Sequence, residues 1–163
     1  MTQEDEISLE VRDAYRKTLL HFIETGRAPH YTELSISLGV PPETALALQR
    51  GAAEVGVGSW MLANTDYVEC WAPFSNVPTQ HLISVDGEQR WYGQCGLEAL
   101  AASYMFPGKA VTIDSRCVDC ADSVSVTVRG DEILNIDPPE AVGHMNEQFA
   151  KGEWNKDRSA SHL

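Results

Sequence analysis

Residues 92–108 read YGQCGLEALAASYMFPG, and this stretch decides how the second half of the chain folds. Apolar residues recur in it at helical spacing, and Pro107–Gly108 ends the run. We therefore predict a helix from about Gln94 to Met105. Cys95 and Glu98 are three residues apart in this helix, so their side chains share one face.

The Cys95–Glu98 spacing allows thiol chemistry. A cysteine in the first turn of a helix is favoured as a thiolate, whereas a carboxylate one turn away raises the thiol pKa unless the pair shares a proton. A thiolate and a carboxylic acid with one shared proton form a nucleophile or metal ligand beside a proton donor. The competing interpretation is that Cys95 only packs in the core, since cysteine is among the most buried residue types.

Strands flank the predicted helix on both sides. Residues 81–93, HLISVDGEQRWYG, alternate around Asp86–Gly87 and predict a β-hairpin. Three further strands are predicted at 110–114, 123–128 and 132–136. These elements indicate a small mixed β-sheet domain with one central helix.

A second cysteine motif lies between two of the predicted strands. Residues 115–122 read SRCVDCAD and contain Cys117-x-x-Cys120. One such motif is half of a zinc site or a redox dithiol, and no second CxxC completes a tetrahedral site. A site for a soft metal completed by Cys95 or Cys70, and a tight turn with no ligand, both remain open interpretations.

The first part of the chain predicts a winged-helix-like unit. Helices are expected at about 7–24, 32–38 and 42–55, followed by two strands with a turn near residues 64–66. The would-be recognition helix carries Arg50 as its only base. We therefore expect this unit to pack within the protein rather than to bind nucleic acid.

The composition of the chain indicates in which compartment its cysteines act. The chain has 163 residues, 24 acids against 12 Lys and Arg, and a net charge of −12. It holds no apolar run of the roughly 20 residues that cross a bilayer. The stretch MTQEDEISLEVRD does not resemble a secretory signal, so we expect a cytoplasmic protein whose four cysteines are thiols, metal ligands or redox groups.

The predicted fold class is α+β. We expect a winged-helix-like domain at 7–72 and an α/β core at 79–142. A polar, partly disordered segment is expected at 143–163. One helix is expected near 139–151, across the boundary between the core and this segment.

The stretch 85–128, VDGEQRWYGQCGLEALAASYMFPGKAVTIDSRCVDCADSVSVTV, resembles the core of the organomercurial lyase family (alkylmercury lyase, MerB). The resemblance covers residues 8–142 and is strongest at 82–128. It implies a short, diverged member that lacks the C-terminal half of the family.

The resemblance implies a mechanism. In this family two thiolates capture an organomercurial, and a carboxylic acid protonates the mercury-bound carbon. Cys95 matches the first cysteine, Glu98 stands at the family's aspartate, and Cys117 matches a cysteine considered structural. The second catalytic cysteine of the family has no counterpart, so Cys120 is the candidate to supply it.

The resemblance therefore implies a protein that cleaves carbon–mercury bonds by thiolate capture and protonolysis, or that retains only mercury binding. The implied partner is a small organomercurial or a soft metal ion. No cofactor is required, although Cys95, Cys117 and Cys120 could together hold Hg or Zn through their thiolates. Two alternatives stay open: a non-enzymatic thiolate metal-binding protein, and a winged-helix module that senses metal.

Overall fold

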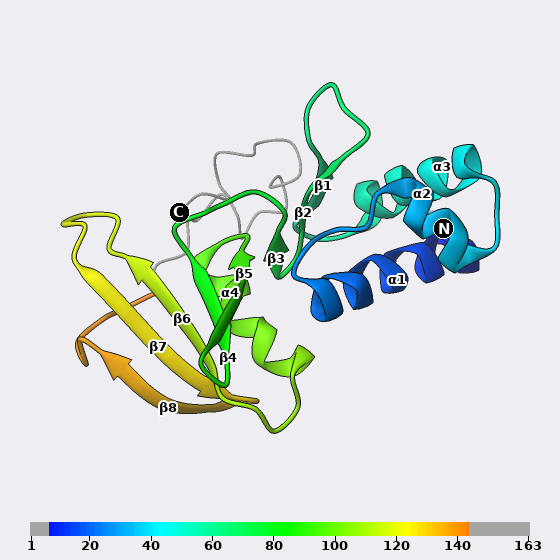
Figure 1. Ribbon diagram of the computed structural model, residues 1–163. Helices are drawn as coiled ribbons and strands as arrows, with labels where there is room; N and C mark the ends of the chain where they lie inside the picture. The colour runs from blue at the N-terminus through cyan, green and yellow to red at the C-terminus, as the bar shows by residue number, and fades with distance from the viewer. Residues whose placement is uncertain (1–6, 144–163) are drawn as a thin grey trace, which may run out of the picture. The chain divides into compact units, whose positions relative to one another are not determined.

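The structure is a computed structural model and describes residues 7–143. The chain divides into two compact units, with the boundary between Trp71 and Ala72. Three of the helices lie in the first unit, whereas the short helix α4 (Gly96–Leu100) and most of the strands lie in the second (Figure 1). Among the described residues, no helix combines the length and the apolar character that a membrane span requires.

The first unit contains three helices and a two-stranded hairpin. The helices are α1 (Leu9–Thr25), α2 (Tyr31–Leu38) and α3 (Pro42–Val55), and the strands are β1 (Ser59–Met61) and β2 (Val68–Trp71). Each helix predicted here is present within a few residues of its expected bounds. Helices followed by a hairpin have the order of a winged-helix unit, an assignment that stays a prediction.

Trp71 anchors the core of this unit. Its side chain is fully buried, its ring centroid lies 5.1 Å from that of Tyr15, and its indole N–H donates to the Tyr15 carbonyl oxygen at 3.2 Å. Burial of an indole is favourable when its N–H has a partner. The last strand of the hairpin is thereby attached to the first helix.

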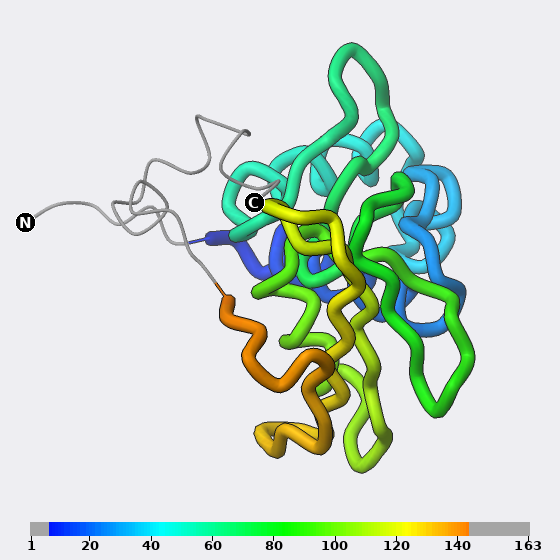
Figure 2. The backbone as a smooth tube through the Cα atoms, turned by 90° about the vertical axis from the view of Figure 1, so that its left-hand side faces the viewer, coloured from blue at the N-terminus to red at the C-terminus, as the bar shows by residue number. Residues whose placement is uncertain are grey.

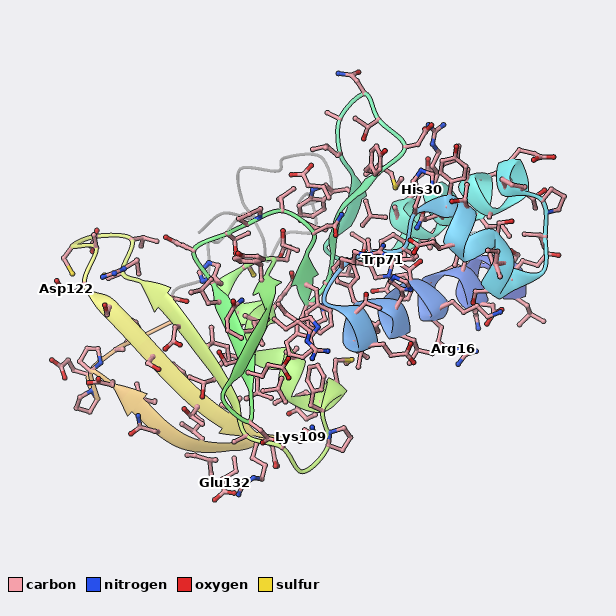
Figure 3. The ribbon with its side chains drawn as sticks, viewed as in Figure 1. Arg16, His30, Trp71, Lys109, Asp122 and Glu132 are labelled. Carbon is pink, nitrogen blue, oxygen red and sulfur yellow. The ribbon has the colours of Figure 1, made fainter. Side chains whose placement is uncertain are left out.

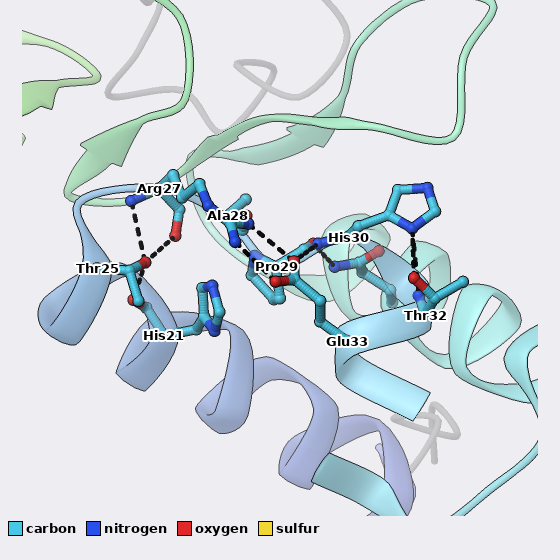
Figure 4. A network of polar contacts seen from close by, with 9 residues as sticks. His21, Thr25, Arg27, Ala28, Pro29, His30, Thr32 and Glu33 are labelled. Atoms are coloured by element: carbon cyan, nitrogen blue, oxygen red, sulfur yellow. Dashed lines mark hydrogen bonds and ion pairs between the residues drawn. The ribbon is translucent and has the colours of Figure 1, made fainter. Parts of the chain in front are cut away.

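A polar network holds the connection between α1 and α2 (Figure 4). The Arg27 guanidinium donates to both carboxylate oxygens of Glu33, at 2.8 and 2.6 Å, and Glu33 also accepts from the His30 backbone N–H at 2.8 Å. His30 is the N-cap of α2, so Glu33 completes a capping box. These bonds lower the pKa of Glu33 to about 2, with the Arg27 side chain as the largest cause.

The second unit is an antiparallel sheet with one helical segment. Its strands are β3 (Phe74–Ser75), β4 (Leu82–Val85), β5 (Glu88–Gly93), β6 (Val111–Arg116), β7 (Ser123–Arg129) and β8 (Glu132–Asp137), in the spatial order β3-β5-β4-β6-β7-β8. The strand β8 runs beside β7 at the edge, as Figures 1 and 2 show. The predicted α+β class is confirmed, but the sheet expected to be mixed is antiparallel in its described pairs.

Register places the apolar core at the centre of this sheet. Ile83 pairs with Trp91 on one side and with Ile113 on the other, and all three are buried. Phe106 packs against Trp91, and the centroids of the two rings are 4.8 Å apart. The helical segment that ends next to Phe106 is therefore held against the middle strands.

Two predicted details change in the structure. The helix expected at 94–105 is instead α4 (Gly96–Leu100) followed by a 3₁₀ turn, η1 (Ala101–Met105). The chain bends at residues 94 and 95, and Cys95 has an extended conformation as the N-cap of α4. A hydrogen bond of 2.7 Å from the Ser103 hydroxyl to the Gly130 carbonyl anchors the 3₁₀ turn. The strand β3 was not predicted, because two residues are too few to show a strand period.

The predicted C-terminal features fall largely beyond the described residues. Of the helix expected near 139–151, residues 139–143 are not helical, and the rest lies outside the described residues. The partly disordered segment predicted at 143–163 lies outside them as well, apart from its first residue.

Candidate functional site

Cys95 sits at a sharp change from strand to helix. The strand β5 ends at Gly93, and Cys95 is the N-cap of α4 with φ −144° and ψ 169°. Between them, Gln94 donates its backbone N–H to the Pro73 carbonyl at 2.9 Å. The site therefore depends on an extended backbone that turns into a helix within two residues.

Gly93 makes this turn possible. A Cβ atom on residue 93 would lie 2.7 Å from the Ala99 Cβ and 3.2 Å from the His81 Cβ. Real Cβ atoms essentially never make contacts under 3.0 Å, so any other residue at this position would have to displace its neighbours. The missing side chain lets the first turns of α4 lie directly on the end of β5.

The structure brings Cys95 and Glu98 together as predicted. The Cys95 sulfur accepts the Glu98 backbone N–H at 3.4 Å, and the two side chains interact. Burial is the largest cause that raises the pKa of Cys95, and the Glu98 carboxylate raises it further, against N–H bonds from residues 97 and 98 that lower it. Cys95 is only 7% exposed.

Glu98 is the unusual member of the pair. Burial raises the pKa of its carboxyl, and the interaction with Cys95 opposes that shift. Its Oε2 atom is buried and has no hydrogen-bond partner among the described residues. A buried carboxyl oxygen without a partner is costly to stability, which makes Glu98 a candidate for a chemical role.

His81 packs against this turn, a contact that no pattern in the sequence indicates. The imidazole is 6% exposed, and its Nδ1 lies 2.8 Å from the Ser115 hydroxyl on β6. A Cβ added to Gly96 would lie 3.3 Å from the imidazole Cε1. Burial lowers the pKa of His81, which favours the neutral ring beside the Cys95–Glu98 pair.

The cysteines of the CxxC motif lie in the turn between β6 and β7. Cys117 is half-buried and Cys120 is exposed. Backbone N–H groups of residues 120 and 119 lower the pKa of Cys117. An N–H bond from Asp122 lowers the pKa of Cys120, but the Cys117 and Asp122 side chains outweigh it, so this pKa is raised.

The predicted three-cysteine site is not formed within residues 7–143. No group of three or more His, Cys, Asp or Glu side chains in this range is arranged to hold a metal ion. Cys95 and Glu98 form one pair, and Cys117 and Cys120 form another. Cys70 is buried in β2 of the first unit.

Comparison with known proteins identifies the family. The family model for alkylmercury lyase, MerB, matches residues 74–161, which is more than half of the chain. An alkylmercury lyase of Staphylococcus epidermidis is 41% identical over 69 residues, which are 40% of this chain and 30% of that protein. An alkylmercury lyase of Bacillus cereus is 35% identical over 69 residues, which are 40% of this chain and 29% of that protein.

The fold matches a solved structure over a longer range. The crystal structure of the mercury-bound form of MerB2 aligns with a TM-score of 0.57 and 18% identity, and the alignment covers 81% of this chain and 69% of that one. The sequence matches to the curated relatives span less than a third of their length. The β5–α4 turn with Cys95 and Glu98 lies inside the matched residues, and the chain belongs to the alkylmercury lyase family.

Proposed function

We propose that this protein is an organomercurial lyase in which Cys95 captures the mercury and Glu98 protonates the carbon. The buried, unpartnered Glu98 Oε2 beside a buried thiol carries this proposal. Burial holds a proton on a carboxyl more tightly, and a carboxylic acid is the group that protonolysis needs. Mercury is soft and prefers thiolate ligands, which assigns the capture step to the sulfur.

The proposed steps balance with one proton. The Cys95 thiol passes its proton to the Glu98 carboxylate while its sulfur bonds to the mercury of an adduct R–Hg–SR′. The Glu98 carboxylic acid then gives that proton to carbon as the carbon–mercury bond breaks. The products are R–H and mercury(II) held between the Cys95 sulfur and SR′, and Glu98 is a carboxylate again.

The second sulfur in these steps comes from a solution thiol. The described residues place neither Cys117 nor Cys120 in a metal-holding group with Cys95 and Glu98. An organomercurial in a thiol-containing compartment carries a thiolate of its own, which supplies the second donor. A reducing cytoplasm provides such thiols and keeps Cys95 reduced, so we propose a cytoplasmic location and no resident cofactor.

Release of arene from an arylmercury substrate tests the proposal. Phenylmercury is mixed with excess N-acetylcysteine and the protein, and benzene is measured by gas chromatography. Cys95→Ser is expected to abolish release, and Glu98→Gln to slow it by about 10²–10⁴-fold, the usual contribution of a positioned acid. Glu132→Gln, which changes an exposed glutamate at the start of β8, is the matched control and should release benzene at the native rate.

Two results would contradict the proposal. Native turnover by Cys95→Ser would remove the sulfur from the mechanism. A stable Cys95–mercury–phenyl adduct with no benzene would instead leave a protein that binds mercury without cleaving the carbon bond.

A further inference from the structure

The turn that carries Cys117 and Cys120 is closed by backbone bonds. Cys117 donates its N–H to the Asp122 carbonyl at 2.8 Å and accepts the Ala121 N–H at 2.9 Å. Ala121 adopts a left-handed backbone with φ 62°, which allows the chain to reverse directly after Cys120. The positions of the two cysteines are therefore set by the turn itself.

The two sulfurs lie side by side in this turn. Their side chains form a hydrogen bond with each other, and the Cys117 sulfur also accepts backbone N–H groups of residues 119 and 120. Hydrogen bonds from the backbone orient a ligand sulfur before a metal arrives. One cation with metal–sulfur bonds of about 2.3 Å can join two sulfurs that are already neighbours.

The turn is open to solvent and carries negative charge. Cys120 is exposed, Asp119 lies between the two cysteines, and Asp122 follows two residues after Cys120. Figure 3 shows Asp122 at the tip of the β6–β7 hairpin, at the opposite end of these strands from Lys109 and Glu132. The negative charge attracts a divalent cation to this turn. The cation can then reach the exposed Cys120 thiol without any rearrangement of the protein core.

The number of donors selects the kind of cation. No third His, Cys, Asp or Glu joins the two cysteines in a metal-holding group within residues 7–143. Zinc in proteins takes four ligands in a structural site and three with water in a catalytic one. A two-sulfur site suits a soft cation that two thiolates can coordinate without further ligands, as they can Hg²⁺.

We propose that Cys117 and Cys120 form a surface site that binds one Hg²⁺ through two thiolates, independently of Cys95 and Glu98. Binding forms two sulfur–mercury bonds and releases the two thiol protons to solvent. No oxidant or reductant takes part. The site does not depend on the proposed lyase activity, because it needs only the two sulfurs of the turn.

Competition with a monothiol tests this site. The fully reduced Cys95→Ser protein is titrated with mercuric chloride, bound mercury is counted by native mass spectrometry, and accessible thiols are counted with a colorimetric reagent. We expect one bound Hg²⁺ and the loss of two thiols. Cys117→Ser or Cys120→Ser in the same protein leaves one sulfur, so the N-acetylcysteine concentration that removes half the mercury should fall by about 100-fold or more.

The control is Val118→Ala, which changes an exposed side chain of the same turn and keeps both sulfurs. It should retain mercury as the Cys95→Ser protein does, and circular dichroism confirms that every variant is folded. Equal retention by Cys120→Ser and by its parent would overturn the proposal. Zn²⁺ held against the monothiol as strongly as Hg²⁺ would overturn the two-thiolate assignment. Because Cys95 is absent throughout, neither result depends on whether the native chain is a lyase.

Discussion

Gly93 and Ala99 approach so closely that a Cβ atom on residue 93 would lie 2.7 Å from the Ala99 Cβ. This contact joins the end of β5 to the second turn of the helical segment that holds Cys95 and Glu98. The packing of α4 on the end of β5 thus depends on Gly93, which contributes no side chain to the Cys95–Glu98 pair. It also makes the site sensitive to a single methyl group.

Gly93→Ala is expected to destabilise the second unit and to slow benzene release. The added methyl forces α4 away from β5, and overpacking of this kind costs about 1–3 kcal/mol. Displacement of a catalytic group by about 1 Å can reduce a rate by roughly 100-fold. Urea unfolding and the benzene assay measure the two effects.

Gly51→Ala is the matched control for Gly93→Ala. A Cβ at residue 51 would meet the Val11 side chain at 3.6 Å, an ordinary van der Waals contact. Alanine replaces glycine inside α3, which should stabilise the protein by about 0.5–1 kcal/mol. Equal unfolding midpoints for the two variants would show that the close approach at Gly93 is not rigid.

Glu98→Gln is expected to make Cys95 more reactive toward a small alkylating reagent while it slows protonolysis. The charge of Glu98 and its interaction with the thiol both raise the pKa of Cys95, so their loss lowers that pKa and increases the thiolate fraction near pH 8. Peptide mass spectrometry after timed alkylation gives the rate at Cys95 alone. Slower alkylation of Glu98→Gln than of the native protein would contradict the assigned coupling.

The Arg27–Glu33 pair is expected to stabilise the first unit only above acidic pH. The pKa of Glu33 is about 2 in the folded state, against an ordinary value of 4.5. A carboxyl with a lowered folded pKa contributes fully above the unfolded value, and the contribution is lost as pH falls from about 4.5 to 2. The two side chains are 53% and 40% exposed, so the effect should be about 1 kcal/mol or less.

Glu33→Gln isolates this effect. The amide oxygen can still accept the His30 N–H, but the charge is gone, so unfolding of the variant should depend less on pH between 4.5 and 2. An NMR titration of the Glu33 carboxyl measures the pKa directly. A midpoint near the ordinary value would refute the pairing.

His81 is expected to titrate below the ordinary histidine pKa of 6.5, because burial disfavours its charged form. The unfolded chain then takes up a proton at higher pH than the folded one, so stability should decline as pH falls below about 6.5 toward the folded value. His81→Gln should flatten that decline. The imidazole Cε1–H resonance followed against pH provides the measurement, and a midpoint above 6.5 would show that the ring is not desolvated.

Local features of this protein could be predicted from its sequence. Helical spacing located α1, α2 and α3, the Asp86–Gly87 turn located the β4–β5 hairpin, and the three-residue spacing placed Cys95 beside Glu98. These helices, this hairpin and this residue pair each depend on backbone geometry over a few residues. That geometry is determined by residues that are close together in the sequence.

The long-range relationships depend on strand register and packing. Register in the β4–β6 ladder brings His81 to Ser115, 34 residues away, and the packing of α4 on Gly93 brings the same imidazole to Gly96. The sequence was also compatible with Cys117 or Cys120 joining Cys95, whereas the folded β6–β7 hairpin leaves them as a separate pair. The sequence by itself determined the local thiol–acid pair, because both residues belong to one short turn. Only the tertiary structure decided which distant side chains surround it, because that depends on how the strands align.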